Sequence, residues 1–149
     1  MKVGIQESDF DVLLEMEEIR KNNPNVGAIV SFVGLVRDFG GSGKVKGMML
    51  EHYPGMTEKC LETLLNEAME RWEIVDATVV HRIGRLFASD QIVLVLVAGH
   101  HRKEAFRAAE FVIDRLKTEA PLWKKEETEE GWRWVDAKAS DEAASSEWE

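Results

Sequence analysis

Residues 91–117 read QIVLVLVAGHHRKEAFRAAEFVIDRLK, and this stretch decides the fold class. Gln91 to Ala98 is almost entirely aliphatic, which is typical of a central strand covered on both faces. From Arg102 to Lys117, apolar side chains recur at helical spacing and predict a helix with one buried stripe. Because strands and helices elsewhere do not alternate strictly, the sequence favours an α+β fold.

The same periodicity rules predict further elements along the chain. Helices are expected over 8–20, capped by Ser8, and over 57–72; strands are expected over 26–36, 45–53, 74–83 and 132–135. Gly34 predicts a bulge or a close backbone approach within its strand. The glycine-rich segment 39–44 predicts a flexible connection and not a nucleotide loop, because Val45 stands where Ser or Thr would bind magnesium.

Length and composition indicate one domain. The chain has 149 residues, which we divide into a domain over 1–138 and an acidic tail over 139–149 that is frayed or ordered by a partner. Neither a signal peptide nor a membrane span is expected, which favours a cytoplasmic protein.

Cys60, the one cysteine, lies on the apolar stripe of helix 57–72, so we expect a buried structural thiol. The four histidines lack metal-ligand spacing, and no metal or cofactor is expected.

Charge is distributed unevenly. The formal net charge is −9, yet residues 100–125 carry seven basic and four acidic side chains. A local basic stretch in an acidic protein fits a small anionic ligand better than nucleic acid or an anionic membrane. A solvated helix surface explains the same charges equally well.

His101 and Arg102 stand where the aliphatic strand ends and the helix begins. Helix N-termini bind anions through free N–H groups and the helix dipole, and an arginine there adds a bidentate donor. Cations at this end are unfavourable to the helix itself, so the pair predicts a bound phosphate or carboxylate. The alternative is that both side chains point into solvent.

Three more cations are candidate site residues. Lys117 ends the helix, where the dipole alone would favour a cation. Lys124 follows Trp123, whose ring could shelter the amine and lower its pKa. Arg37 follows an apolar strand and precedes the glycine-rich segment, and the exits of buried strands commonly carry site residues.

Five segments of the chain together are characteristic of one family. They are Phe32–Arg37, Leu50–Met56, His81–Gly84, His101–Arg102 and Lys117–Lys124. In this order and register, the chain resembles the catalytic (large) subunits of molybdopterin synthase. The resemblance implies an α/β hammerhead-type fold with an antiparallel β subdomain.

The resemblance also implies an activity and its partners. Such subunits transfer sulfur to cyclic pyranopterin monophosphate and form the dithiolene of molybdopterin. The sulfur arrives as a thiocarboxylate on the C-terminal Gly-Gly of a small ubiquitin-like subunit. The assembly is a heterotetramer around a homodimer of large subunits, and the pocket receives residues from both members of that dimer.

By position, the resemblance assigns roles to the candidate residues. Lys117 is the principal catalytic lysine, and Lys124 lies beside the incoming tail. His101 and Arg102 bind the pterin phosphate, with His100 left open as the alternative histidine, and Arg37 completes the anion pocket. A non-catalytic module that docks a ubiquitin-like tail is the rival interpretation; a phosphate-ester hydrolase would lack a metal cluster or an obvious nucleophile.

Overall fold

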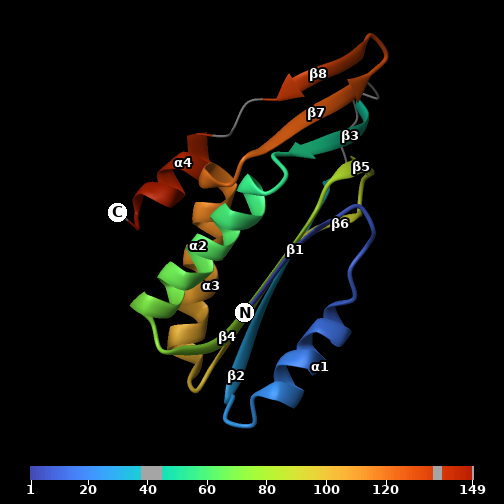
Figure 1. The fold of residues 1–149 in the computed structure, drawn as a ribbon. Coiled ribbons are helices and arrows are strands. Elements are labelled where there is room, and N and C mark those ends of the chain that lie inside the picture. The colour runs from blue at the N-terminus through green and yellow to red at the C-terminus, as the bar shows by residue number, and fades with distance from the viewer. Residues whose placement is uncertain (38–44, 136–138, 149) are drawn as a thin grey trace.

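The computed structural model describes residues 1–37, 45–135 and 139–148, which form two four-stranded sheets and four helices (Figure 1). The first sheet has the order β1 (Lys2–Gln6), β4 (Ile74–Arg82), β6 (Gln91–Gly99), β2 (Ala28–Leu35). The second has the order β5 (Gly84–Leu86), β3 (Val45–His52), β7 (Leu122–Thr128), β8 (Gly131–Val135). The helices are α1 (Val12–Asn22), α2 (Met56–Arg71), α3 (Arg102–Glu119) and α4 (Ala139–Ser146).

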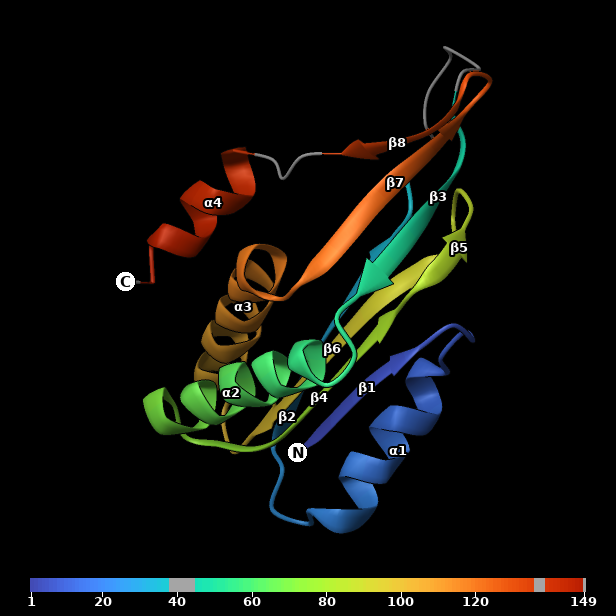
Figure 2. The same ribbon diagram turned by 45° about the horizontal axis from the view of Figure 1, so that its top comes forward.

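Strand β6 forms the centre of the first sheet, as its aliphatic sequence predicts. Its side chains alternate between two apolar clusters. Val93 and Val95 face the cluster that α2 and α3 cover, whereas Leu94 and Leu96 face the cluster that contains Phe10 and part of α1. Figure 2 shows α1 on one side of this sheet and α2 and α3 on the other. The strand is therefore buried on both faces.

The second sheet begins where β4 ends. Strand β5 follows β4 after one residue and pairs with β3, and β3 pairs with β7 on its other edge. Val36, Met48, Leu50 and Leu86 form a small buried cluster beneath it. All pairings are antiparallel except that of β1 with β4. The predicted α+β class, with its antiparallel subdomain, is confirmed.

Helix α1 begins four residues later than predicted, because its cap is Asp11 and not Ser8. One carboxylate oxygen of Asp11 accepts hydrogen bonds from the backbone N–H groups of Leu13 and Leu14. An aspartate in this role satisfies two of the donors that a helix start leaves open. Ser8 instead accepts bonds from the Gln6 side chain.

The irregularity predicted at Gly34 is present. The register between β2 and β6 shifts between Gly34 and Leu35. A Cβ atom on Gly34 would lie 2.6 Å from a methyl carbon of Val93. The close approach explains why a residue without a side chain occupies this position. The glycine-rich segment 39–44 lies outside the described residues.

The C-terminal segment is a helix, where the sequence favoured a frayed or partner-ordered tail. Helix α4 packs beside α3, and the following Trp148 is only 7% exposed. Its indole Nε1 donates a hydrogen bond to Asp114 at 2.8 Å, and its ring makes edge contacts with Trp72 and Phe111. Burial of one large aromatic therefore orders the segment. The division of the chain at residue 138 stays a prediction.

Within the described residues, no helix is both long and apolar enough to cross a membrane.

Candidate functional site

His101 and Arg102 begin α3, at the end of the first sheet where β6 finishes. His101 is the N-cap residue, with extended backbone (φ −132°, ψ 150°), and its side chain makes no capping hydrogen bond. Both side chains are exposed. The start of an 18-residue helix thus carries an exposed imidazole and an exposed guanidinium, and anion binding there stays a prediction.

The two adjacent histidines have different surroundings. Nδ1 of His100 lies 2.9 Å from the carbonyl oxygen of Asn25 and donates to it. This bond ties the His100 ring to the loop before β2. His101 is thus the better candidate for ligand binding, since its ring is not held by such a bond.

Lys117 lies near the other end of α3, where the last turn of the helix packs over the sheet. Its neighbour Leu116 is buried in the cluster between sheet and helices, while Lys117 itself is exposed. The side chain makes no hydrogen bond or ion pair to any described residue. Its ammonium lies close enough to the buried His81 to contribute to lowering the pKa of that ring.

Lys124 and Arg37 belong to the same end of the molecule as Lys117. Lys124 pairs in register with Leu50 of β3, and Leu50 packs with Val36, the residue before Arg37. Lys124 is half-buried and Arg37 is exposed. Lys124 therefore lies across from a residue that packs with the segment after β2, next to Arg37, while Lys117 lies in the last turn of α3, the helix that precedes β7.

Trp123 and Lys124 are neighbours in β7, where the sequence suggested that the ring shelters the amine. Consecutive side chains of a strand point to opposite faces, and Trp123 is 45% exposed on the outer face of β7. The lysine that lies over an aromatic ring is Lys125, whose Nζ is 4.3 Å from the centroid of the Trp134 ring. The same Nζ donates to Glu51 at 3.0 Å.

The predicted site residues form two groups in a single chain. Arg102 and Lys117 are fifteen positions apart on one helix, which corresponds to about 22 Å along its axis. His101 and Arg102 lie at the β6 exit, and Arg37, Lys117 and Lys124 lie at the sheet junction. One protomer alone therefore does not bring all five cations into one pocket.

Other charged residues that flank these strands have structural partners. The Arg82 guanidinium donates to the backbone carbonyls of Glu7 and Gln91, which ties β1 and β6 to the end of β4. Arg85 pairs with Glu127, and Nε2 of His52 lies 3.7 Å from Glu58. These contacts support the sheets and do not enlarge the site.

The outer face of the second sheet carries exposed aromatic residues, of which the sequence analysis considered only Trp123. Trp123, Trp132 and Trp134 are 44–58% exposed, and Phe87 is 47% exposed. The alternation of Trp132, Arg133 and Trp134 was the available signal, because period-two spacing places both tryptophans on one face.

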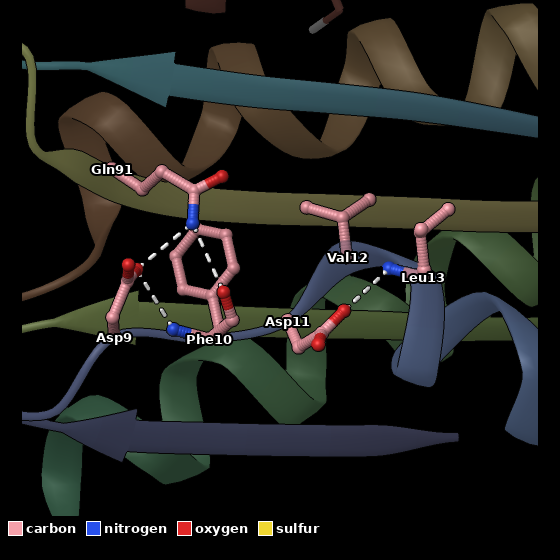
Figure 3. Close-up of a pocket in the computed structure, with 6 residues that line it drawn as sticks. All are labelled: Asp9, Phe10, Asp11, Val12, Leu13 and Gln91. Carbon is pink, nitrogen blue, oxygen red and sulfur yellow. Dashed lines mark hydrogen bonds between the residues drawn. The ribbon is translucent and has the colours of Figure 1, made fainter.

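A surface hollow of about 500 Å³ lies on the α1 side of the molecule (Figure 3). Asp9, Phe10, Asp11 and Gln91 are among its lining residues. Asp9 accepts hydrogen bonds from the Gln91 side chain and from the Phe10 backbone, and the Gln91 bond is the main cause that lowers the pKa of Asp9. A hollow lined by two carboxylates does not suit an anionic ligand.

The chain's own thiol is partly buried, where the sequence predicted a buried one. Sγ of Cys60 lies 3.5 Å from the backbone carbonyl of Glu119, and the residue packs against the core. Burial raises the pKa of Cys60. These contacts agree with the structural role predicted from its place on the α2 stripe. Among the described residues, no three His, Cys, Asp or Glu side chains are grouped as a metal site would need.

A central sheet covered by helices and a second, antiparallel sheet define a protein of the α/β hammerhead type, with cations at both ends of α3. A family model described as "MoaE protein" matches residues 5–119. The chain belongs to the MoaE family.

Named relatives are similar over nearly the whole chain. A molybdopterin synthase catalytic subunit from Ralstonia nicotianae is 53% identical over 98% of this chain and 83% of its own length. Its counterpart from Pseudomonas aeruginosa is 49% identical over 100% of this chain and 99% of its own length. The solved molybdopterin biosynthesis MoaE protein from Burkholderia ambifaria is 52% identical, covers 99% of this chain and 97% of its own, and superimposes with a TM-score of 0.86.

Proposed function

We propose that this chain is the catalytic subunit of a molybdopterin synthase. It transfers sulfur from the C-terminal thiocarboxylate of a small ubiquitin-like carrier to cyclic pyranopterin monophosphate, forming the dithiolene of molybdopterin. The observation that carries the proposal is the similarity over nearly the whole chain to molybdopterin synthase catalytic subunits, and Arg37, Lys117 and Lys124 supply cations on neighbouring segments of this chain. A cytoplasmic location, expected from the sequence, stays a prediction.

The cations at the junction act on two anionic reactants. Both the thiocarboxylate and the pterin phosphate carry negative charge, so a positive pocket attracts them and holds them close together. Lys117 is the general acid/base, and Lys124 stabilises charge on the carrier's carboxyl group as sulfur leaves it. Because sulfur arrives on the carrier, the reaction requires neither a nucleophilic cysteine nor a cofactor from this chain.

The pocket is completed by His101 and Arg102 of a second protomer. Those two residues bind the pterin phosphate with Arg37 of the first protomer. A helix start with exposed imidazole and guanidinium groups suits a phosphate, which accepts bidentate hydrogen bonds from arginine. The roughly 22 Å along α3 between Arg102 and Lys117 is the reason why two chains are needed.

The outer edge of β2 is the surface through which the two protomers meet. Within the described residues this edge pairs with no other strand, and Ala28–Leu35 contains neither charge nor proline. Natural proteins protect such apolar edges, and pairing with a second copy is one way to do so. A two-fold axis makes the two β2 strands antiparallel. The β6 exit of one protomer then lies beside the sheet junction of the other, since β2 runs between these two ends.

Mixing two inactive variants tests the shared pocket. Arg102→Ala and Lys117→Ala chains are each inactive alone, but a mixed dimer contains one site with both wild-type residues. After denaturation and joint refolding of equal amounts, random pairing restores about a quarter of wild-type dithiolene formation. The assay uses the thiocarboxylated carrier and the pyranopterin. No recovery in verified mixed dimers would place all the residues of one site in one chain and overturn the arrangement.

The rival interpretation, a non-catalytic docking module, predicts a different result for sulfur transfer. A docking module binds the carrier and supports no sulfur transfer, with or without Lys117. In our proposal the wild-type chain produces dithiolene, while Lys117→Ala binds the carrier with unchanged affinity and loses turnover. Retained turnover in Lys117→Ala would remove the catalytic role of this lysine.

A further inference from the structure

Thr57 is a fully buried polar residue in the first turn of α2. Its Oγ1 accepts a hydrogen bond from the backbone N–H of Tyr53 at 3.0 Å and donates one to the carbonyl oxygen of Pro121 at 2.9 Å. A hydroxyl group has one proton, so the donor bond goes to Pro121 alone. Thr57 thus joins three segments, namely the residue after β3, the start of α2 and the turn between α3 and β7.

Pro121 lies in the turn between the two lysines of the proposed site. Helix α3 ends two positions after Lys117, and β7 begins two positions before Lys124. The first residue of β7, Leu122, pairs in register with His52, the last residue of β3. The Thr57 hydroxyl therefore holds the backbone at the point where the chain leaves α3 and enters β7.

The backbone that leaves α3 is held by side chains of α2. The last carbonyl groups of a helix have no partner within the helix, and proline has no N–H to donate. Sγ of Cys60, three positions after Thr57 on the same face of α2, lies 3.5 Å from the carbonyl oxygen of Glu119. Ala120 packs in the apolar cluster beneath, but apolar packing has no preferred direction. The hydrogen bond of Thr57 thus defines an orientation that packing alone does not.

We propose that Thr57 is a positioning residue for Lys117 and Lys124: its hydroxyl holds the turn between them and thereby sets how the two ammonium groups lie relative to each other. The inference rests on the catalytic roles proposed for these lysines. Because Thr57 is buried, it acts through the turn and not on a reactant. A displacement of about 1 Å in a catalytic group can lower the rate about a hundredfold, so a small shift of the turn reduces turnover.

Two variants of Thr57 separate the hydroxyl from the rest of the side chain. Thr57→Val nearly keeps the shape and removes both hydrogen bonds, whereas Thr57→Ser keeps the hydroxyl. We expect Thr57→Val to lower kcat for dithiolene formation by about tenfold or more, with KM for carrier and pterin changed by less than about twofold. Thr57→Ser retains at least about half of the wild-type kcat. Thr57→Ala, which also lacks the hydroxyl, replaces Thr57→Val if the valine variant does not fold.

Two control variants separate positioning from stability. Thr63→Val removes a side-chain bond to the Lys59 carbonyl on the exposed face of the same helix and leaves kcat unchanged. Val79→Ala, in the core of the first sheet, lowers thermal stability without changing kcat at temperatures well below unfolding. Wild-type kcat in Thr57→Val, equal losses in the valine and serine variants, or a loss confined to KM would overturn the positioning role.

A second measurement reports on the hydrogen bond and needs no activity. Pro121–Leu122 is the one Pro–Leu pair of the chain, so ¹³C-carbonyl proline together with ¹⁵N-leucine gives a single NMR cross-peak for the Pro121 carbonyl. We expect the carbonyl ¹³C signal to move in Thr57→Val and to stay near the wild-type position in Thr57→Ser and Thr63→Val. A signal that stays in place in Thr57→Val would exclude the bond.

These readouts separate this inference from the proposed function. If the wild-type protein forms no dithiolene, the proposed function fails, whatever the Pro121 signal does. If the wild-type protein is active and the signal moves in Thr57→Val while kcat is unchanged, only the positioning role fails.

Discussion

Gly27 has no room for a side chain. Its backbone N–H donates to the carbonyl of Gly99, and a Cβ atom would lie 2.2 Å from the carbonyl oxygen of His100. Because the obstacle is backbone, a small side-chain rotation cannot relieve the clash. The glycine thus lets the loop before β2 lie directly against the segment that starts α3.

We expect Gly27→Ala to lower the free energy of unfolding by about 2–3 kcal/mol, the range typical of overpacking. Urea denaturation measures the loss. Gly4→Ala is the matched control, because the nearest atoms to a Cβ at Gly4 are 3.9 Å away; it changes the free energy of unfolding by less than about 1 kcal/mol. Equal stability of the two variants would contradict the packing described for Gly27.

His81 makes stability depend on pH in a defined window. The folded ring titrates at about 4 and an unfolded histidine at about 6.5. As pH falls through this window, the histidine binds a proton in the unfolded chain but not in the folded protein. The free energy of unfolding therefore falls. Between pH 7 and pH 4.5, the free energy of unfolding should fall by about 2 kcal/mol more for the wild-type protein than for His81→Leu.

Denaturant unfolding at several pH values measures that difference. His101→Leu removes an exposed histidine and serves as control, with a pH dependence like that of the wild type. If His81→Leu and the wild type lose stability in parallel, the buried ring is not the source.

At the scale of elements, the start of α1 depends on one carboxylate. Asp11→Ala removes the acceptor for two backbone N–H groups and should destabilise the protein by about 1 kcal/mol. Ser8→Ala, at the position that the sequence favoured as the cap, should lower the free energy of unfolding by less than about 0.5 kcal/mol. Thermal unfolding compares the two, and a larger loss for Ser8→Ala would restore the earlier helix start.

Elements with a strong periodic signal could be predicted from the sequence, and the others could not. The aliphatic run of β6 and the stripe of α3 specify their own structures. Strand β7 contains Lys124, Lys125 and Glu126 in a row, and only its pairing with β3 and β8 makes it a strand. Helix α4 has a weak apolar stripe of its own, and its order comes from the burial of Trp148 in a distant part of the chain.

The candidate site, too, could be predicted from the sequence only in part. Local sequence placed His101 and Arg102 at a helix start and Lys117 at a helix end, and the structure has both. The predicted helix from Arg102 to Lys117 already implies that fifteen helical positions separate the two residues, but sequence could not show which other elements lie at each end. The effect of Lys117 on the pKa of the buried His81 was also hidden, since 36 positions of chain separate the two residues and only tertiary packing brings them within electrostatic range.

At the scale of the whole molecule, assembly through β2 can be tested by charge. Ser31 lies near the middle of β2 and is exposed in the single chain. In an antiparallel pair about a two-fold axis, Ser31→Lys would place two ammonium groups close together, which disfavours pairing. We expect this variant to sediment as a monomer and to lose sulfur transfer while its unfolding temperature changes little.

Glu62→Lys, an exposed change on α2, is the control and should remain a dimer. If Ser31→Lys also remains a dimer, the protomers meet through another surface, and the shared pocket would then need a different geometry.

The inward position of Cys60 has a consequence for chemical selectivity. An enzyme that receives a thiocarboxylate is exposed to a side reaction, because a reactive thiolate of its own can attack the thiocarboxyl carbon, form a thioester and release the sulfur as hydrosulfide. Here partial burial raises the pKa of Cys60, which favours the less reactive thiol form, and Sγ lies 3.5 Å from the Glu119 carbonyl oxygen. We therefore expect the carrier's sulfur to be kept for the pterin and not to be lost through acyl exchange with this chain.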